Sequence, residues 1–142
     1  MNVSHIVTRP MITIAATDTV LRAAKLLVQN NIGLLVVTDA GPAGRLAGVI
    51  SERDIIKAVA SGRSLDVPVD AVCTKNVVTV RGDSGVAEVA KAMNKHGIRH
   101  VVVVDESSKP VGVVSMRDLV GERATLTAIL QSNEKEIFHG AD

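Results

Sequence analysis

Hydrophobic and polar positions alternate along this chain in an order that occurs twice. In the first half, short apolar stretches flank a segment whose apolar residues recur every three or four positions, which predicts an amphipathic helix among strands. The predicted order is strand, helix, strand, strand and helix, at residues 11–14, 20–31, 34–38, 46–50 and 52–60. The strand at 34–38 is apolar throughout, so we expect both of its faces to be covered.

The second half of the chain repeats this order. The strand predicted at 77–80 lies 66 positions after the one at 11–14, and the strand at 101–104 keeps the same displacement. Between them, Ser84 takes the position of Asp18, which with Thr19 is a candidate cap of the first helix. The next turn is two residues shorter than its counterpart, and a change of length costs little in such a loop. The pattern therefore indicates an internal duplication.

The duplication predicts how the chain is organised. Each repeat begins with a short apolar lead-in, at 3–7 and again at 69–73, and the Ser-Gly-Arg-Ser stretch at 61–64 is the expected hinge. We therefore divide the chain into a first repeat at 1–62, a second repeat at 63–121 and a C-terminal segment at 122–142, of which 122–130 is compatible with a helix.

The most specific pattern is an apolar run followed by Ser-x-Arg-Asp and then by further apolar residues. It occurs at 48–54 and at 112–118, where a buried strand is expected to turn directly into a helix. A serine followed three residues later by a carboxylate is a variant of the capping box, so each copy can be interpreted as a helix start alone. Two copies at equivalent points, both retaining arginine, favour a shared binding function.

Composition narrows the classes of function. The chain has 142 residues and only one aromatic residue, Phe138, so the core must be aliphatic and no stacking platform for single-stranded nucleic acid is available. The net charge of +1 comes from interspersed acids and bases, which predicts neither nucleic acid nor membrane as a partner. A single cysteine, Cys73, and the lack of a signal peptide or a long apolar run lead us to expect a cytoplasmic protein.

Residues for catalysis are not evident in the pattern. Cys73 has no histidine near it in the sequence to activate it, and the four histidines lack the spacing of metal ligands. His96 and His100 are four residues apart, but Gly97 interrupts the helix between them. No glycine-rich phosphate loop is present. We therefore expect neither an enzyme nor a catalytic cofactor or metal.

Two copies of about sixty residues, each ending in Gly-Val-[Ile/Val]-Ser-x-Arg-Asp, closely resemble a tandem pair of CBS domains, named after cystathionine β-synthase. A further mark of the family is Gly97-Ile98-Arg99-His100 before the strand at 101–104. The resemblance covers residues 1 to about 121. It implies an α/β fold of the α+β type, in which two βαββα repeats pack as one pseudo-twofold module. It also implies two clefts for adenosine-containing ligands such as AMP, ADP, ATP, S-adenosylmethionine or NAD, and a flat dimer of two modules.

The chemistry of the repeated motif fits a nucleoside. The carboxylates of Asp54 and Asp118, fixed in a first helical turn, suit the vicinal hydroxyl groups of a ribose. The same turns offer unpaired backbone N–H groups for phosphate oxygens. Ser51 and Ser115 are candidate donors to ribose or phosphate.

The resemblance also assigns the remaining site residues. It places Thr74, Asn76 and Val77 opposite Asp54, and Thr8, Pro10 and Met11 opposite Asp118. The adenine ring is then expected between aliphatic side chains, for which the candidates are Ile32, Val49, Ile98 and Val113.

The two clefts are not expected to be equivalent. Arg99 and His100 match positions that are often basic and reach phosphates, although a solvent-exposed turn would also explain them. The first repeat has Gly33-Leu34 instead, so the cleft that Arg99 and His100 reach is expected to prefer phosphorylated ligands. For two further arginines, Arg53 and Arg117, phosphate contact and simple solvent exposure both remain open.

Three classes of function therefore remain to be weighed. The first is a stand-alone regulatory module that senses an adenine nucleotide and signals to a protein partner not identifiable from the sequence. The second is an enzyme, and the third is a structural dimerisation unit with degenerate clefts. We expect a homodimer, because the helices beginning after Ser51 and Ser115 carry apolar stripes that include Ile55, Ile56, Val59, Leu119 and Val120.

Overall fold

A computed structural model describes residues 1–7, 11–40, 44–121 and 130–131. The predicted site residue Thr8, its neighbour Pro10 and nearly all of the helix expected at 122–130 lie outside the described residues. In the described part of the chain, no helix is long and apolar enough to cross a membrane.

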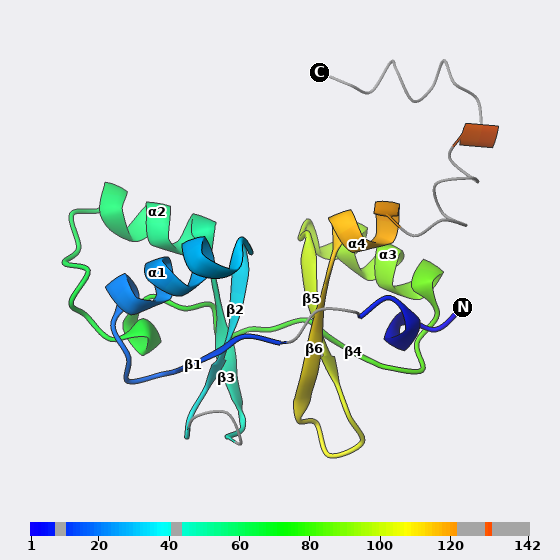
Figure 1. The fold of residues 1–142 in the computed structure, drawn as a ribbon, viewed down its shortest axis with the longest axis horizontal. Coiled ribbons are helices and arrows are strands. Elements are labelled where there is room, and N and C mark those ends of the chain that lie inside the picture. Colours follow the sequence, from blue (N-terminus) through cyan, green and yellow to red (C-terminus); the bar gives the residue numbers. More distant parts are fainter. Residues whose placement is uncertain (8–10, 41–43, 122–129, 132–142) are drawn as a thin grey trace.

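The two repeats have the same succession of elements, as the duplication predicts (Figure 1). The first contains η1 (Val3–His5), β1 (Thr13–Ala15), α1 (Val20–Asn30), β2 (Leu34–Thr38), β3 (Leu46–Ser51) and α2 (Glu52–Ala60). The second contains η2 (Val69–Ala71), β4 (Thr79–Arg81), α3 (Val86–His96), β5 (His100–Val104), β6 (Pro110–Ser115) and α4 (Met116–Gly121). The predicted α/β class is confirmed, and the apolar lead-ins each contain one turn of 3-10 helix.

Each repeat forms a three-stranded sheet with the order β1-β2-β3 or β4-β5-β6. The first pair of strands in each sheet is parallel and the second pair is antiparallel. The sheets stand side by side at the centre of the molecule, with α1 and α2 beside one and α3 and α4 beside the other (Figure 1). Val36, Val102 and Val104 form a core between the sheets, so the central strands are apolar on both faces, as expected for β2.

The lead-ins are exchanged between the repeats. Val3 is buried in the core of the second repeat, and Val69 is buried in the core of the first. The backbone N–H of Val3 donates to Ser84 O at 2.9 Å, and that of Asp70 donates to Ala16 O at 3.0 Å. Figure 1 shows the N-terminal turn in dark blue beside the second repeat. Each helix-and-sheet layer is therefore completed by a segment that lies outside it in the sequence.

The caps of the first long helix in each repeat differ. Thr19 caps α1, with its side chain accepting from Arg22 N at 3.1 Å, and Asn31 ends that helix at φ 52°. The prediction that Ser84 caps α3 is wrong, because Gly85 is the N-cap and no side chain closes that end. Ser84 lies in the preceding turn, where its N–H donates to Arg81 O and its carbonyl accepts from the exchanged lead-in.

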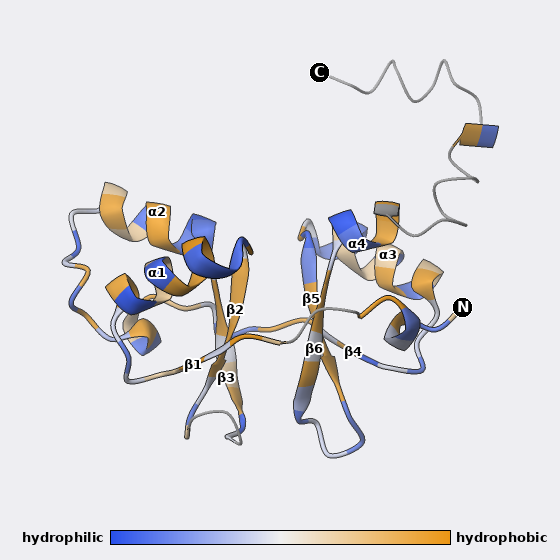
Figure 2. Cartoon of the chain, viewed as in Figure 1, coloured by the Kyte–Doolittle hydropathy of each residue, from blue (hydrophilic) through white to orange (hydrophobic). Residues whose placement is uncertain are grey.

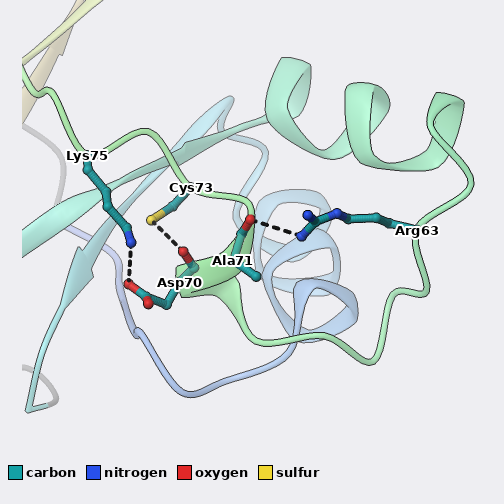
Figure 3. Close-up of polar contacts among 5 residues, drawn as sticks. All are labelled: Arg63, Asp70, Ala71, Cys73 and Lys75. Carbon is teal, nitrogen blue, oxygen red and sulfur yellow. Dashed lines mark hydrogen bonds and ion pairs between the residues drawn. The ribbon is translucent and has the colours of Figure 1, made fainter.

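The segment after α2 is held by polar contacts among its own residues (Figure 3). Gly62 takes a φ of 80°, which favours glycine, and Arg63 Nη1 donates to Ala71 O at 3.0 Å. Lys75 pairs with Asp70 at 3.4 Å, but both side chains are exposed, so the pair contributes little stability. Burial raises the pKa of the nearby Cys73 thiol, which favours the unreactive protonated form.

Candidate functional site

The two Ser-x-Arg-Asp motifs form reciprocal hydrogen bonds at the starts of α2 and α4. Ser51 N donates to Asp54 Oδ2 at 2.9 Å, and Asp54 N donates to Ser51 Oγ at 3.1 Å. Ser115 and Asp118 make the same pair of bonds at 2.8 and 3.1 Å. Capping is therefore present in both repeats, and it uses only one oxygen of each carboxylate.

A cavity of about 1030 Å³ lies between the repeats at the Asp118 end. It is large enough for a nucleotide-sized ligand. Elements of both repeats line it, and eight of the sequence-predicted site residues and adenine-wall candidates are among them: Met11, Ile32, Arg99, His100, Val113, Ser115, Arg117 and Asp118. The fold thus brings together one of the two residue groups that the sequence analysis assembled. That these residues contact a ligand stays a prediction.

The group around Asp54 is arranged differently. Thr74 Oγ1 donates to Asp54 Oδ1 at 3.2 Å and lies 3.4 Å from Oδ2, so the oxygen left free by the cap is already engaged. The backbone of Thr74 also pairs with Val49, at 2.9 and 2.8 Å in the two directions. Neither Asp54 nor Thr74 lines the cavity at the Asp118 end.

The other predicted residues of this group also lie away from that cavity. Val77 packs against the core between the sheets, and Ile98 packs against the core of the second repeat. Arg53 and Asn76 are exposed. The structure therefore separates the residues expected around Asp54 from those around Asp118.

His100 lines the Asp118 cavity together with residues of both repeats. Its imidazole is half-buried, and this burial lowers its pKa below the ordinary value of 6.5. The carboxylates of Asp118 and Glu52 oppose the shift, and the guanidinium of Arg99 reinforces it. Neutral imidazole is therefore the favoured form at pH 7.

Several cavity residues were not identified from the sequence. The most important is Glu52, whose carboxylate approaches the second repeat at His100. Its position in a first helical turn is visible in the sequence, but no local pattern reports a contact between the repeats. Ile12, Met116 and the apolar residues of α1 and α2 that extend the cavity were missed for the same reason. Among the described residues, no group of histidine, cysteine and carboxylate side chains is arranged to hold a metal ion.

Comparisons with known structures identify this architecture. The chain is similar to a CBS domain protein of Pyrobaculum aerophilum solved in complex with AMP, with 37% identity and a TM-score of 0.84 over 93% of this chain and 100% of that one. It is also similar to a CBS domain pair solved with 5′-methylthioadenosine and S-adenosyl-L-methionine, with 34% identity and a TM-score of 0.77 over 84% of this chain and 96% of that one.

Relatives among curated proteins differ in length. An uncharacterized 17.7 kDa protein of Acidianus ambivalens is 39% identical over 117 residues, which are 82% of this chain and 70% of the relative. The L-aspartate semialdehyde sulfurtransferase of Methanocaldococcus jannaschii is 35% identical over 117 residues, but these are only 22% of that enzyme. The model of the CBS domain matches this chain at residues 3–61 and again at 69–124. The chain therefore belongs to the CBS domain family and carries the domain twice.

Proposed function

We propose that this chain is a regulatory module that binds an adenosine-containing ligand in the cavity at Asp118. The observation that carries the proposal is the cavity itself, in which one cap carboxylate, two arginines and aliphatic walls converge from both repeats. Two similar CBS proteins were solved with AMP and with adenosyl thioether or sulfonium compounds, which supports an adenosine group as the common part of the ligand.

In this proposal the ribose hydroxyls donate to the oxygen of Asp118 that the cap does not use. No described residue donates a hydrogen bond to that oxygen, whereas its equivalent on Asp54 accepts from Thr74. The adenine ring lies against Ile32, Met11 and Val113, and the group at the 5′ position extends toward Arg99 and His100.

We further propose that the module acts without catalysis. The described residues around Asp118 bind and orient, and none of them is a nucleophile paired with a base. The match to a small part of a sulfurtransferase is consistent with an accessory module in larger proteins. Cys73 remains a free thiol, which fits the reducing cytoplasm.

We also propose a homodimer formed through the outer helices. Val28 on α1 is 82% exposed and Ile56 on α2 is 65% exposed, although both also line the cavity, and Val59 and Val120 add to this apolar surface. Figure 2 shows hydrophobic positions on the outer helices as well as on the strands. The expectation that Leu119 contributes is wrong, because this side chain is only 2% exposed and belongs to the core of the second repeat. Neighbouring residues of a helix point in different directions, so α4 places Leu119 in the core and Val120 at the surface.

The ribose contact is tested by Asp118→Asn, which keeps an oxygen that can accept the Ser115 N–H but removes the charge. We expect affinity for AMP to fall by about tenfold to a hundredfold, the range for a lost hydrogen bond to a charged group. Isothermal titration of the wild-type chain and the variant measures the loss. Asp54→Asn is the matched control, because it makes the same change in the first repeat and leaves the cavity at Asp118 intact.

Unchanged AMP affinity in Asp118→Asn would show that this carboxylate is only a cap. A wild-type chain that binds neither AMP, ATP, NAD nor S-adenosylmethionine would favour the structural dimerisation unit instead. A thermal-shift panel of these compounds gives the first answer, because ligand at 100 times Kd adds about 2.7 kcal/mol to the free energy of unfolding.

A further inference from the structure

Glu52 brings a carboxylate of the first repeat to the part of the cavity where the second repeat presents its basic residues. A Cβ atom placed on Gly33 would lie 2.9 Å from Glu52 Oε1 and 3.7 Å from His100 Cε1. The glutamate and the imidazole therefore approach each other over a residue that has no side chain. Glu52 and His100 both line the cavity, and the charge of Glu52 acts on His100.

The internal duplication shows that this carboxylate is not required by the fold. Glu52 N donates to Gly33 O at 3.0 Å, and at the equivalent point Met116 N donates to Arg99 O at 2.7 Å. The two backbones thus make the same bond, but the second repeat has a neutral thioether in place of the carboxylate. The capping bonds of α2 are made by Ser51 and Asp54. Glu52 has no part in them.

The cavity consequently has a mixed charge. Arg99 and Arg117 contribute two positive charges, Glu52 and Asp118 contribute two negative charges, and His100 is favoured neutral. The one ion pair among the described residues joins Lys75 and Asp70, so Glu52 is not neutralised by a close partner. Once Asp118 has bound the ribose, the carboxylate of Glu52 remains to act on whatever the 5′ position carries.

We propose that Glu52 is a specificity-determining residue that selects ligands by the charge of their 5′ group. It disfavours polyphosphates and favours a 5′ group that is neutral or bears a cationic centre, such as a sulfonium or an ammonium. This inference rests on the proposed adenosine site. The physical reason is that the interaction of a fixed carboxylate with the ligand scales with ligand charge, which is zero for adenosine, about −2 for AMP and about −4 for ATP.

The test is the isosteric variant Glu52→Gln, titrated calorimetrically with adenosine, AMP, ATP and S-adenosylmethionine. We expect adenosine affinity to be unchanged, AMP to bind about threefold more tightly and ATP about tenfold more tightly, because solvent moderates each charge contact. S-adenosylmethionine is expected to bind about threefold more weakly. Raising the salt concentration is expected to shrink all three changes.

Glu88→Gln is the matched control, because Glu88 also lies in a first helical turn, is exposed and does not line the cavity. It removes the same net charge and is expected to leave every affinity unchanged. Equal changes of affinity for all four ligands in Glu52→Gln would overturn the selective role of Glu52 but not the adenosine site. The same changes of affinity in Glu88→Gln would have the same meaning. Failure of the wild-type chain to bind any of the four ligands would overturn the adenosine site and the selectivity together.

Discussion

His100 lies half-buried between Asp118, Glu52 and Arg99, and its pKa is lowered chiefly by the loss of hydration. A histidine that is harder to protonate in the folded chain makes folding dependent on pH. Between the lowered folded pKa and the ordinary value of 6.5, the unfolded chain binds a proton that the folded chain does not. The free energy of unfolding therefore falls as pH drops through that window, and the loss is complete below the folded pKa.

The prediction at this scale is that His100→Gln removes part of the acid sensitivity of the wild-type chain. Urea unfolding between about pH 5.5 and 7.5 gives the free energy of unfolding of each chain as a function of pH. The difference between the wild-type slope and the slope of His100→Gln reports the imidazole, because carboxylate protonation contributes equally to both chains. His96→Gln is the control, since His96 is exposed at the end of α3. A wild-type slope equal to that of His100→Gln would show that the imidazole is freely protonated.

At the scale of elements, β3 and β6 each have a glycine at the point where another segment of the chain crosses the strand. Each of these segments leads from a lead-in to the first strand of the other sheet. A Cβ atom on Gly48 would lie 2.6 Å from the backbone oxygen of Thr74. At the equivalent Gly112, the closest atom is Val7 Cγ1, also at 2.6 Å, but this is a side-chain atom. The same contact distance therefore has different consequences, because a side chain can change rotamer and a paired backbone cannot move alone.

We predict that Gly48→Ala destabilises the fold by about 2 kcal/mol and that Gly112→Ala costs less. Thermal and urea unfolding of both variants measure the two losses. The larger loss is expected at Gly48 because the bonds between Val49 and Thr74 must open or shift. A larger loss at Gly112 would contradict this account.

The outer helices yield a further prediction at the same scale. Ile56→Glu is expected to convert the dimer to a monomer of 14.9 kDa without unfolding it, because this side chain is 65% exposed. Leu119→Glu is expected to unfold the second repeat, since it places a charge in a core. Light scattering coupled to size exclusion gives the masses, and circular dichroism reports folding. A wild-type monomer at micromolar concentration would refute the dimer.

The sequence predicted most elements because their signals are local and occur twice. Hydrophobic periodicity, caps and turns predicted α2 with an end near Ala60, and the reciprocal bonds of Ser51 and Asp54 follow from the motif alone. Relations across the pseudo-twofold axis were not predictable in this way. The inward turn of Leu119, the approach of Glu52 to His100 and the engagement of Asp54 by Thr74 all depend on which surfaces meet.

The resemblance to the CBS family predicts some of these relations between the repeats. It pairs Thr74 with Asp54 and Met11 with Asp118, and the fold places Thr74 within hydrogen-bond distance of Asp54 and Met11 in the same cavity as Asp118. What it could not supply is the approach of Glu52 to His100 over Gly33, which depends on residues particular to this chain.

At the scale of the whole molecule, the exchange of lead-ins has a consequence for synthesis on the ribosome. The first repeat cannot close its core until Val69 has emerged, and Val3 must wait for the second repeat to be made before it has a core to enter. We therefore expect the nascent first half to leave apolar surface open during translation, and the chain to fold as one late cooperative event rather than repeat by repeat. The duplicated halves are two in sequence, but the ribosome releases a single folding unit.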